Sequence, residues 1–189
     1  MELALLLPIV VPLVLLLVFL LANYNRFVRV VQHMRESWSD IEVEMKRRYE
    51  LIPNLVETVR GYARHEETVL KEVVQLRNQA LENTGSAASQ ALDETALAIG
   101  LKRLFAVVEG YPDLKASTHF LALQEELANT EDRIAAARRF FNNAVQEYNT
   151  GIQQFPAALF AGMFGFHERT FFDPGDQRAA LDQAPNVKF

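Results

Sequence analysis

The sequence predicts an all-α protein: an N-terminal transmembrane helix, an antiparallel four-helix bundle of long helices, and an apolar C-terminal tail. Three observations predict this class. A charge-free apolar run opens the chain, apolar residues then recur at steps of three and four, and no stretch alternates with period two for long enough to be a strand. We expect the anchor over residues 1–23, the bundle over 24–153 and the tail over 154–189.

The apolar run from Leu3 to Ala22 is long enough to be a membrane anchor. A helix of about 20 residues, rising about 1.5 Å each, spans the roughly 30 Å hydrocarbon core of a bilayer. Pro8 and Pro12 lie within the run, where a membrane helix tolerates them. The alternative is a cleaved signal peptide. It fits less well, because the run is long, Glu2 precedes it without any Lys or Arg, and no small-x-small cleavage pattern follows.

The flanking charges predict the orientation of the anchor. No Lys or Arg precedes the run, whereas Arg26, Arg29 and Arg35 follow it. Because basic residues favour the cytoplasmic side, we expect a single-pass protein with its N-terminus outside and its bundle in the cytoplasm.

Composition excludes several classes of function. The chain has no cysteine, so disulfides, thiolate catalysis and thiolate metal sites are excluded. Its 19 Lys and Arg stand against 24 Asp and Glu, and every basic residue lies after the anchor. This mildly acidic balance argues against nucleic acid as a partner.

Four apolar stripes predict the helices of the bundle. Their period of about 3.5 residues is typical of helices packed at a shallow angle, as in coiled coils. A Gly/Ser/Asn turn at residues 82–89 and the sequence "GYPDL" separate the later stripes. We expect helices over about 24–51, 54–83, 88–110 and 113–152, with the first continuing straight from the membrane span. The stripes are Tyr24, Phe27, Val31, Met34, Trp38, Ile41 and Met45; Val59, Ala63, Glu66, Leu70, Val73, Arg77 and Ala80; Leu97, Leu101, Leu104, Val108 and Tyr111; and Phe120, Leu123, Leu127, Glu131, Ile134, Arg138, Phe141, Val145, Tyr148 and Ile152.

Pro53 divides the stretch "KRRYELIPNLVETV" at residues 46–59. Proline inside a helix costs about 3 kcal/mol, whereas at the first helical position that cost vanishes. We therefore expect a corner at residues 51–53, although a kink in one long rod is the alternative. Lys46, Arg47 and Arg48 would then lie in the last turns of a helix, where cations complement the helix dipole. A phosphate or partner site at these three residues is the less favoured interpretation.

Three long segments resemble the LemA family. They are "YNRFVRVVQHMRESWSDIEVEMKRRYELIPNLVETVRGYARHE", "EGYPDLKASTHFLALQEELANTEDRIAAARRFFNNAVQEYN" and the tail "FPAALFAGMFGFHERTFF…PNVKF". The resemblance implies a four-helix bundle behind a membrane helix in the bacterial cytoplasmic (inner) membrane. It also implies a link to membrane or envelope stress and to membrane-bound proteases. One departure is Phe141, which stands where the family usually has the Tyr of a second YN pair.

Four charged residues on the apolar stripes are candidate sites, because a charge in a bundle core is costly unless it is paired. They could form a network that fixes helix register, or bind an anionic partner. They could also lie at the edge of the seam with their stems packed and their charges in water. We favour the structural interpretations. The residues are Glu66, Arg77, Glu131 and Arg138.

The C-terminal tail is rich in phenylalanine, and so apolar a stretch must be covered. Three surfaces are possible for covering the tail: the chain's own bundle, the membrane interface, or another copy of the chain. The residues are Phe155, Phe160, Phe164, Phe166, Phe171 and Phe172.

No catalytic, cofactor or metal residue is predicted. The four histidines lie far apart, and "RHEET" lacks the second His of a zinc-protease motif. No nucleophile elbow, Ser/His/Asp arrangement or Gly-rich phosphate loop is present. We therefore do not expect an enzyme, although a pocket with converging carboxylates would revive that alternative. The histidines are His33, His65, His119 and His167.

The sequence favours an interaction protein: a membrane-anchored helical scaffold or adaptor that assembles with itself. The expected partners are the lipid bilayer, further copies and membrane proteins. This hypothesis predicts that polar substitution of Phe160 and Phe164 abolishes assembly. The alternative is a transmembrane sensor that passes a signal through the first helix, and an enzyme is a remote third.

Overall fold

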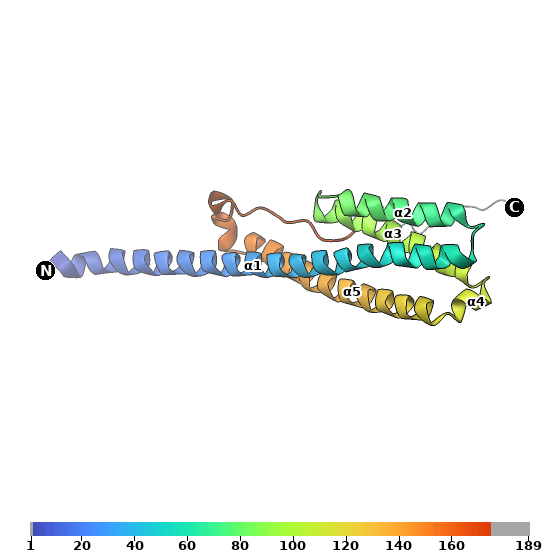
Figure 1. The fold of residues 1–189 in the computed structure, drawn as a ribbon. Coiled ribbons are helices and arrows are strands. Elements are labelled where there is room, and N and C mark those ends of the chain that lie inside the picture. The colour runs from blue at the N-terminus through green and yellow to red at the C-terminus, as the bar shows by residue number, and fades with distance from the viewer. Residues whose placement is uncertain (1, 175–189) are drawn as a thin grey trace.

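The structure is a computed structural model that describes residues 2–174, with side chains from residue 8 onward. Residues 175–189 of the expected tail, including "PNVKF", lie outside the described residues. The described part is all α, without a strand, as the sequence predicts (Figure 1). Its elements are α1 (Glu2–Tyr62), α2 (Glu67–Glu82), α3 (Ala87–Val108), α4 (Pro112–Lys115), α5 (Thr118–Gln153), and the 3-10 helices η1 (Ala157–Leu159) and η2 (Gly162–Phe164).

Helix α1 is a rod that runs almost the whole length of the molecule (Figure 1). Its N-terminal part projects alone, and its C-terminal part packs with α2, α3 and α5, each long helix antiparallel to the preceding one. Among the described helices, α1 is the one long and apolar enough to cross a membrane, and the protein buries none of its most apolar window. The expected continuity between membrane span and first bundle helix is confirmed.

The expected corner at residues 51–53 is wrong, because α1 continues through Pro53 to Tyr62. The chain turns instead at residues 63–66. Ile52 and Leu55 are fully buried on either side of the proline, whereas Pro53 itself faces solvent. Burying an aliphatic side chain contributes about 1.5–3 kcal/mol, so a few such residues offset the cost of one proline. The expected helices 24–51 and 54–83 are therefore the bundle part of α1 and a shorter α2.

The later boundaries lie close to those expected, with one difference. Ser86 caps α3 by accepting a hydrogen bond of 3.2 Å from the backbone N–H of Ser89. The expected helix 113–152 is divided into the single turn α4 and the long α5. Ser117 accounts for the division, because its side chain accepts from the N–H of Phe120 and so begins a new helix.

The apolar stripes form the core, as the sequence predicts. Phe27 is the first buried side chain of the described part of α1, and Gly151 of α5 lies against it. A Cβ at Gly151 would lie 2.8 Å from Cε1 of Phe27, so only glycine permits this approach of the two helices. The buried stripe residues are Phe27, Met34, Ile41, Met45, Val59, Ala63, Leu70, Val73, Ala80, Leu97, Leu101, Leu104, Val108, Phe120, Leu123, Leu127, Ile134, Phe141, Val145, Tyr148 and Ile152.

The described part of the tail is covered unevenly. Phe172 is fully buried against the bundle and Phe166 is partly buried. Phe155 is 82% exposed, and Phe164 and Phe171 are also exposed. The chain's own bundle therefore covers one end of the tail and leaves the other end open.

Candidate functional site

Arg48 lies in the bundle core with only 2% of its surface exposed. It forms an ion pair with Glu94 of α3, which is 5% exposed, and its Nη1 lies 2.6 Å from Oε1 of Glu131 on α5. A buried guanidinium is tolerated when carboxylates pair with it and accept its hydrogen bonds. One side chain of α1 thus joins three helices.

Tyr49 completes this buried cluster. Its hydroxyl donates a hydrogen bond to Glu94, so that carboxylate has two partners from adjacent positions of α1. Burial raises the pKa of the Tyr49 hydroxyl, while the nearby positive charge of Arg48 opposes the rise. The cluster fixes how α1 and α3 are placed along one another, because neither partner of Glu94 can shift without leaving a buried polar group unpaired.

The three basic residues before Pro53 do not mark a helix end, so the dipole interpretation is wrong. Arg47 contacts Glu126 of α5 through its Nη2 at 2.9 Å, and Lys46 lines a surface cleft. The sequence did not predict that Arg48 is buried, although it lies three positions after the buried Met45 of the first stripe. The expected corner at residues 51–53 placed Arg48 in the last turns of a helix instead. Glu94 likewise lies three positions before Leu97 on the third stripe.

The structure brings together two of the predicted residues, Pro53 and Arg77. A proline has no N–H, so the carbonyl four residues earlier, that of Tyr49, loses its helical partner. Arg77 of α2 donates its Nε–H to this carbonyl at 3.1 Å. The side chain of one helix thereby replaces the hydrogen bond that the proline removes from another.

Of the other predicted charges, Glu131 and Arg138 line the same cavity beside Arg48, whereas Glu66 does not line it. Glu66 accepts a hydrogen bond of 3.3 Å from the hydroxyl of Tyr111, and Glu131 pairs with Arg48. The guanidinium carbon of Arg138 lies 4.9 Å from the ring centre of Phe172. Each charged residue thus serves a different contact between elements.

Two asparagines of α5 hold the tail, and sequence reasoning missed both. Asn142 accepts from the N–H of Phe172 at 2.8 Å and donates to its carbonyl at 3.2 Å. Asn149 makes the same pair of bonds to the backbone of Arg169, each at 2.9 Å. The available signal was their spacing, since both follow an aromatic residue and lie one heptad apart on α5. The first of those aromatic residues, Phe141, packs its ring 5.3 Å from that of Trp38.

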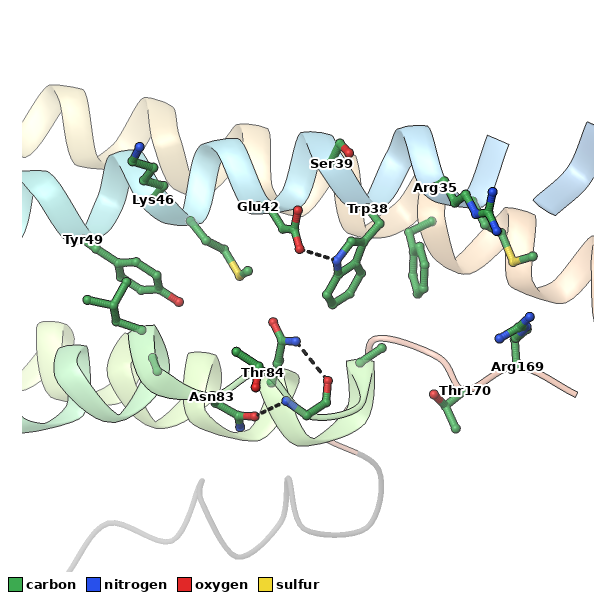
Figure 2. A pocket seen from close by; sticks show the side chains of 18 of the residues that line it. Arg35, Trp38, Ser39, Glu42, Lys46, Tyr49, Asn83, Thr84, Arg169 and Thr170 are labelled. Atoms are coloured by element: carbon green, nitrogen blue, oxygen red, sulfur yellow. Dashed lines mark hydrogen bonds between the residues drawn. The ribbon is translucent and has the colours of Figure 1, made fainter. Parts of the chain in front are cut away.

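A cleft of about 790 Å³ lies between α1, the turn from α2 to α3, and the tail (Figure 2). Trp38 forms part of its wall and donates its Nε1–H to Glu42 at 2.6 Å. Arg35, Lys46 and Arg169 supply three cations, and the remaining lining is largely apolar. This volume is within the range of ligand pockets, but the described lining holds no histidine and only one carboxylate. Its chemistry therefore suits binding of an apolar or acidic segment better than proton transfer.

A second cavity, of about 190 Å³, adjoins Arg48 and includes both Glu94 and Glu131. These are converging carboxylates, the feature that would favour an enzyme. Both form ion pairs with the single guanidinium of Arg48, so each carboxylate is held in a contact between helices. Among the described residues no three His, Asp or Glu side chains gather as metal ligands, and all four histidines are exposed.

An N-terminal helix long and apolar enough to cross a membrane, which continues into a four-helix bundle, defines a helical-bundle protein with one candidate membrane span among its described helices. The model of the LemA family matches residues 37–189, and the chain belongs to that family.

Three relatives are similar to the chain. Magnetosome protein MamQ of Magnetospirillum gryphiswaldense is 28% identical over 86% of this chain and 69% of its own length. Magnetosome protein MamQ 2 of Paramagnetospirillum magneticum is 29% identical over 81% of this chain and 65% of its own length. Protein LemA of Metamycoplasma hominis is 26% identical over 69% of this chain and 60% of its own length. The chain thus spans about two thirds of the length of these relatives. None of these names states a reaction.

Proposed function

We propose that this protein is a non-enzymatic, membrane-anchored scaffold that assembles with copies of itself, in the setting of membrane or envelope stress. The observation that carries the proposal is the unbroken course of α1 from the apolar run to Tyr62. The anchor and the first bundle helix form one rod because α1 is continuous. Arg48 joins the bundle part of this rod to α3 and α5. Such a rod holds a surface at a fixed distance from the membrane, which is the task of a scaffold.

The surroundings of the buried charges support a role without catalysis. Glu94 and Glu131 are held in ion pairs, and the cleft between α1, the turn from α2 to α3, and the tail offers cations and apolar side chains. That cleft is the concave surface such a scaffold would offer to a partner. Two relatives carry the name of the magnetosome rather than of a reaction.

Particle size tests self-assembly. The full chain, of 21.5 kDa, is extracted in mild detergent and weighed by light scattering and by mass photometry. We expect particles that contain several chains, which dissociate in a denaturing detergent. Single chains at every protein concentration, in detergent and in lipid nanodiscs, would remove self-assembly from the proposal.

The structure alters one experiment that the sequence suggested. The rings of Phe160 and Phe164 contact Phe19 and Tyr24 of the same chain. Polar substitution of these two residues would therefore displace the tail, and a loss of assembly would not identify the contact between copies. The sizing experiment should accordingly be made first with the unaltered chain.

The second candidate is a sensor, which the continuity of α1 also favours. A sensor changes the packing of its bundle when its membrane changes, whereas a scaffold does not. Spin labels at Gly61→Cys on α1 and Lys71→Cys on α2 report the distance between those helices. Vesicles of different acyl-chain length supply the stimulus. A shift in the distance distribution would favour the sensor, and an unchanged distribution the scaffold.

A further inference from the structure

Residues 155–164 form a turn of the tail, here called the foot, that exposes apolar side chains. From Phe155 to Phe166 the sequence has no charged or polar side chain. Phe155, Leu159 and Met163 are 82%, 69% and 86% exposed, respectively. Three large apolar side chains so exposed on one short segment form a surface that a soluble protein normally covers.

The foot lies beside the membrane end of α1 (Figure 1). The ring of Phe160 is 6.4 Å from that of Phe19, and the ring of Phe164 is 5.7 Å from that of Tyr24. Phe19 is three residues from the end of the apolar run, about 5 Å along the helix axis. The foot is therefore level with the boundary between hydrocarbon and headgroups.

The bundle holds the foot at this level. Phe166, which follows the foot, packs its ring 5.2 Å from that of Phe27 and 6.3 Å from that of Tyr148. Three residues further on, the paired hydrogen bonds with Asn149 fix the backbone of Arg169. The foot thus packs against α1 through Phe160 and Phe164, whereas Phe155, Leu159 and Met163 are left exposed.

We infer that the foot is a second membrane contact, in which Phe155, Leu159 and Met163 insert into the bilayer interface beside the α1 span. Through Phe160 the foot contacts Phe19, which lies within the exposed apolar part of α1 from Ile9 to Leu21 that a bilayer would surround. Aromatic and apolar groups on otherwise uncharged segments bind at this depth of a membrane. The inference rests on α1 being a membrane anchor, and does not require self-assembly.

Labels on the foot test the inference in the full chain. Because the chain has no cysteine, Phe155→Cys, Leu159→Cys and Met163→Cys each provide one site for an environment-sensitive fluorophore. Phe140→Cys is the matched control, because Phe140 is an exposed phenylalanine like Phe155, with an exposed fraction of 68%. It lies about 20 Å along α5 from the end of that helix next to the foot. The protein is placed in vesicles of phosphatidylcholine and phosphatidylglycerol, with and without brominated acyl chains.

We expect blue-shifted emission from the three foot labels and at least twofold quenching by brominated lipid, with little quenching by aqueous iodide. The Phe140 label should show the reverse. Foot labels that iodide reaches as readily as the control would overturn the inference, because the foot would then lie in water. Protection from both quenchers would also overturn it, since another copy would then cover the foot. Unchanged helix content by circular dichroism establishes that each variant is folded.

Discussion

The residue with the most consequence in the described core is Arg48, because three other side chains depend on its charge. Glu94 is buried with it, Tyr49 donates to Glu94, and Glu131 reaches it from the edge of the core. Replacing such a set by apolar residues can be neutral, whereas removing one member leaves a buried charge unpaired and costs about 3–5 kcal/mol. We therefore interpret the cluster as fixing the register between α1 and α3, rather than as raising the free energy of unfolding.

Tyr49 gives this cluster a dependence on pH. Burial raises the pKa of its hydroxyl above that in the unfolded chain. The folded state then holds its proton more tightly, so the contribution is complete below the unfolded pKa of about 10 and is lost as pH rises through the folded pKa. We expect the free energy of unfolding, from urea titrations followed by circular dichroism, to fall as the pH rises above the unfolded pKa of about 10.

The variant Tyr49→Phe separates this effect from other alkaline changes. At neutral pH it should destabilise the protein by about 1–3 kcal/mol, because Glu94 loses a buried donor. Its stability should then fall less steeply with pH than that of the unaltered chain. Tyr62→Phe is the control, since Tyr62 is 49% exposed at the end of α1. Parallel pH curves for the Tyr49 variant and the unaltered chain would contradict the argument.

At the scale of elements, the course of α1 shows where sequence reasoning succeeds and fails. The periodicity predicted most of the buried apolar positions, because burial of a stripe is a local and repeated signal, but it did not include Ile52, Leu55 and Val56 beside Pro53. It could not predict that α1 passes through Pro53, because the compensating donor, Arg77, belongs to another helix. Arg77 lies 28 positions along the chain from Tyr49, whose carbonyl accepts its hydrogen bond.

The candidate site was less predictable for the same reason. Arg77 and Glu131 could be singled out as charges on apolar stripes, but their partners Tyr49 and Arg48 lie across the bundle. The pairing of Asn142 with Phe172 depends on how the tail returns along α5, which no local pattern specifies. The outward side of the foot likewise depends on the position of α1 rather than on its own sequence.

The contact between Pro53 and Arg77 yields a test of coupling between elements. Arg77→Met leaves the carbonyl of Tyr49 without a donor and should cost about 1–3 kcal/mol in the free energy of unfolding. Pro53→Ala restores the missing N–H within α1 and should stabilise the protein by up to about 3 kcal/mol. In the Pro53→Ala background, Arg77→Met should cost markedly less, because the helix then satisfies its own carbonyl.

Urea unfolding of the four proteins in this double-mutant cycle measures the coupling. Arg60→Met is the control, since Arg60 is an exposed cation of α1 whose Nη1 lies 2.7 Å from Oε1 of Glu57 on the same helix. It should have little effect in either background. Strictly additive effects of Pro53→Ala and Arg77→Met would show that the contact does not compensate for the proline.

For the whole molecule, the rod sets distance as well as direction. From the end of the apolar run at Ala22 to Tyr62, α1 rises about 60 Å, so the turn into α2 lies far from the membrane. The foot and the end of α5 lie instead beside the part of α1 that adjoins the apolar run (Figure 1). The cleft lies between these two levels, and Arg35, Lys46 and Arg169 line it.

The side of the membrane on which this rod stands is the last prediction. Arg26, Arg29 and Arg35 follow the apolar run, so the bundle should be cytoplasmic. Gly61→Cys is the best reporter, because its position is exposed and a Cβ there meets no atom within 4 Å. A membrane-impermeant maleimide should label Gly61→Cys and Thr150→Cys in inverted vesicles but not in right-side-out vesicles. It should label Glu2→Cys in right-side-out vesicles but not in inverted vesicles. Labelling of Gly61→Cys in intact right-side-out vesicles would place the bundle outside. The charges after the anchor would then act through contacts such as that between Arg26 and Glu147 of α5, at 3.5 Å, rather than through the membrane potential.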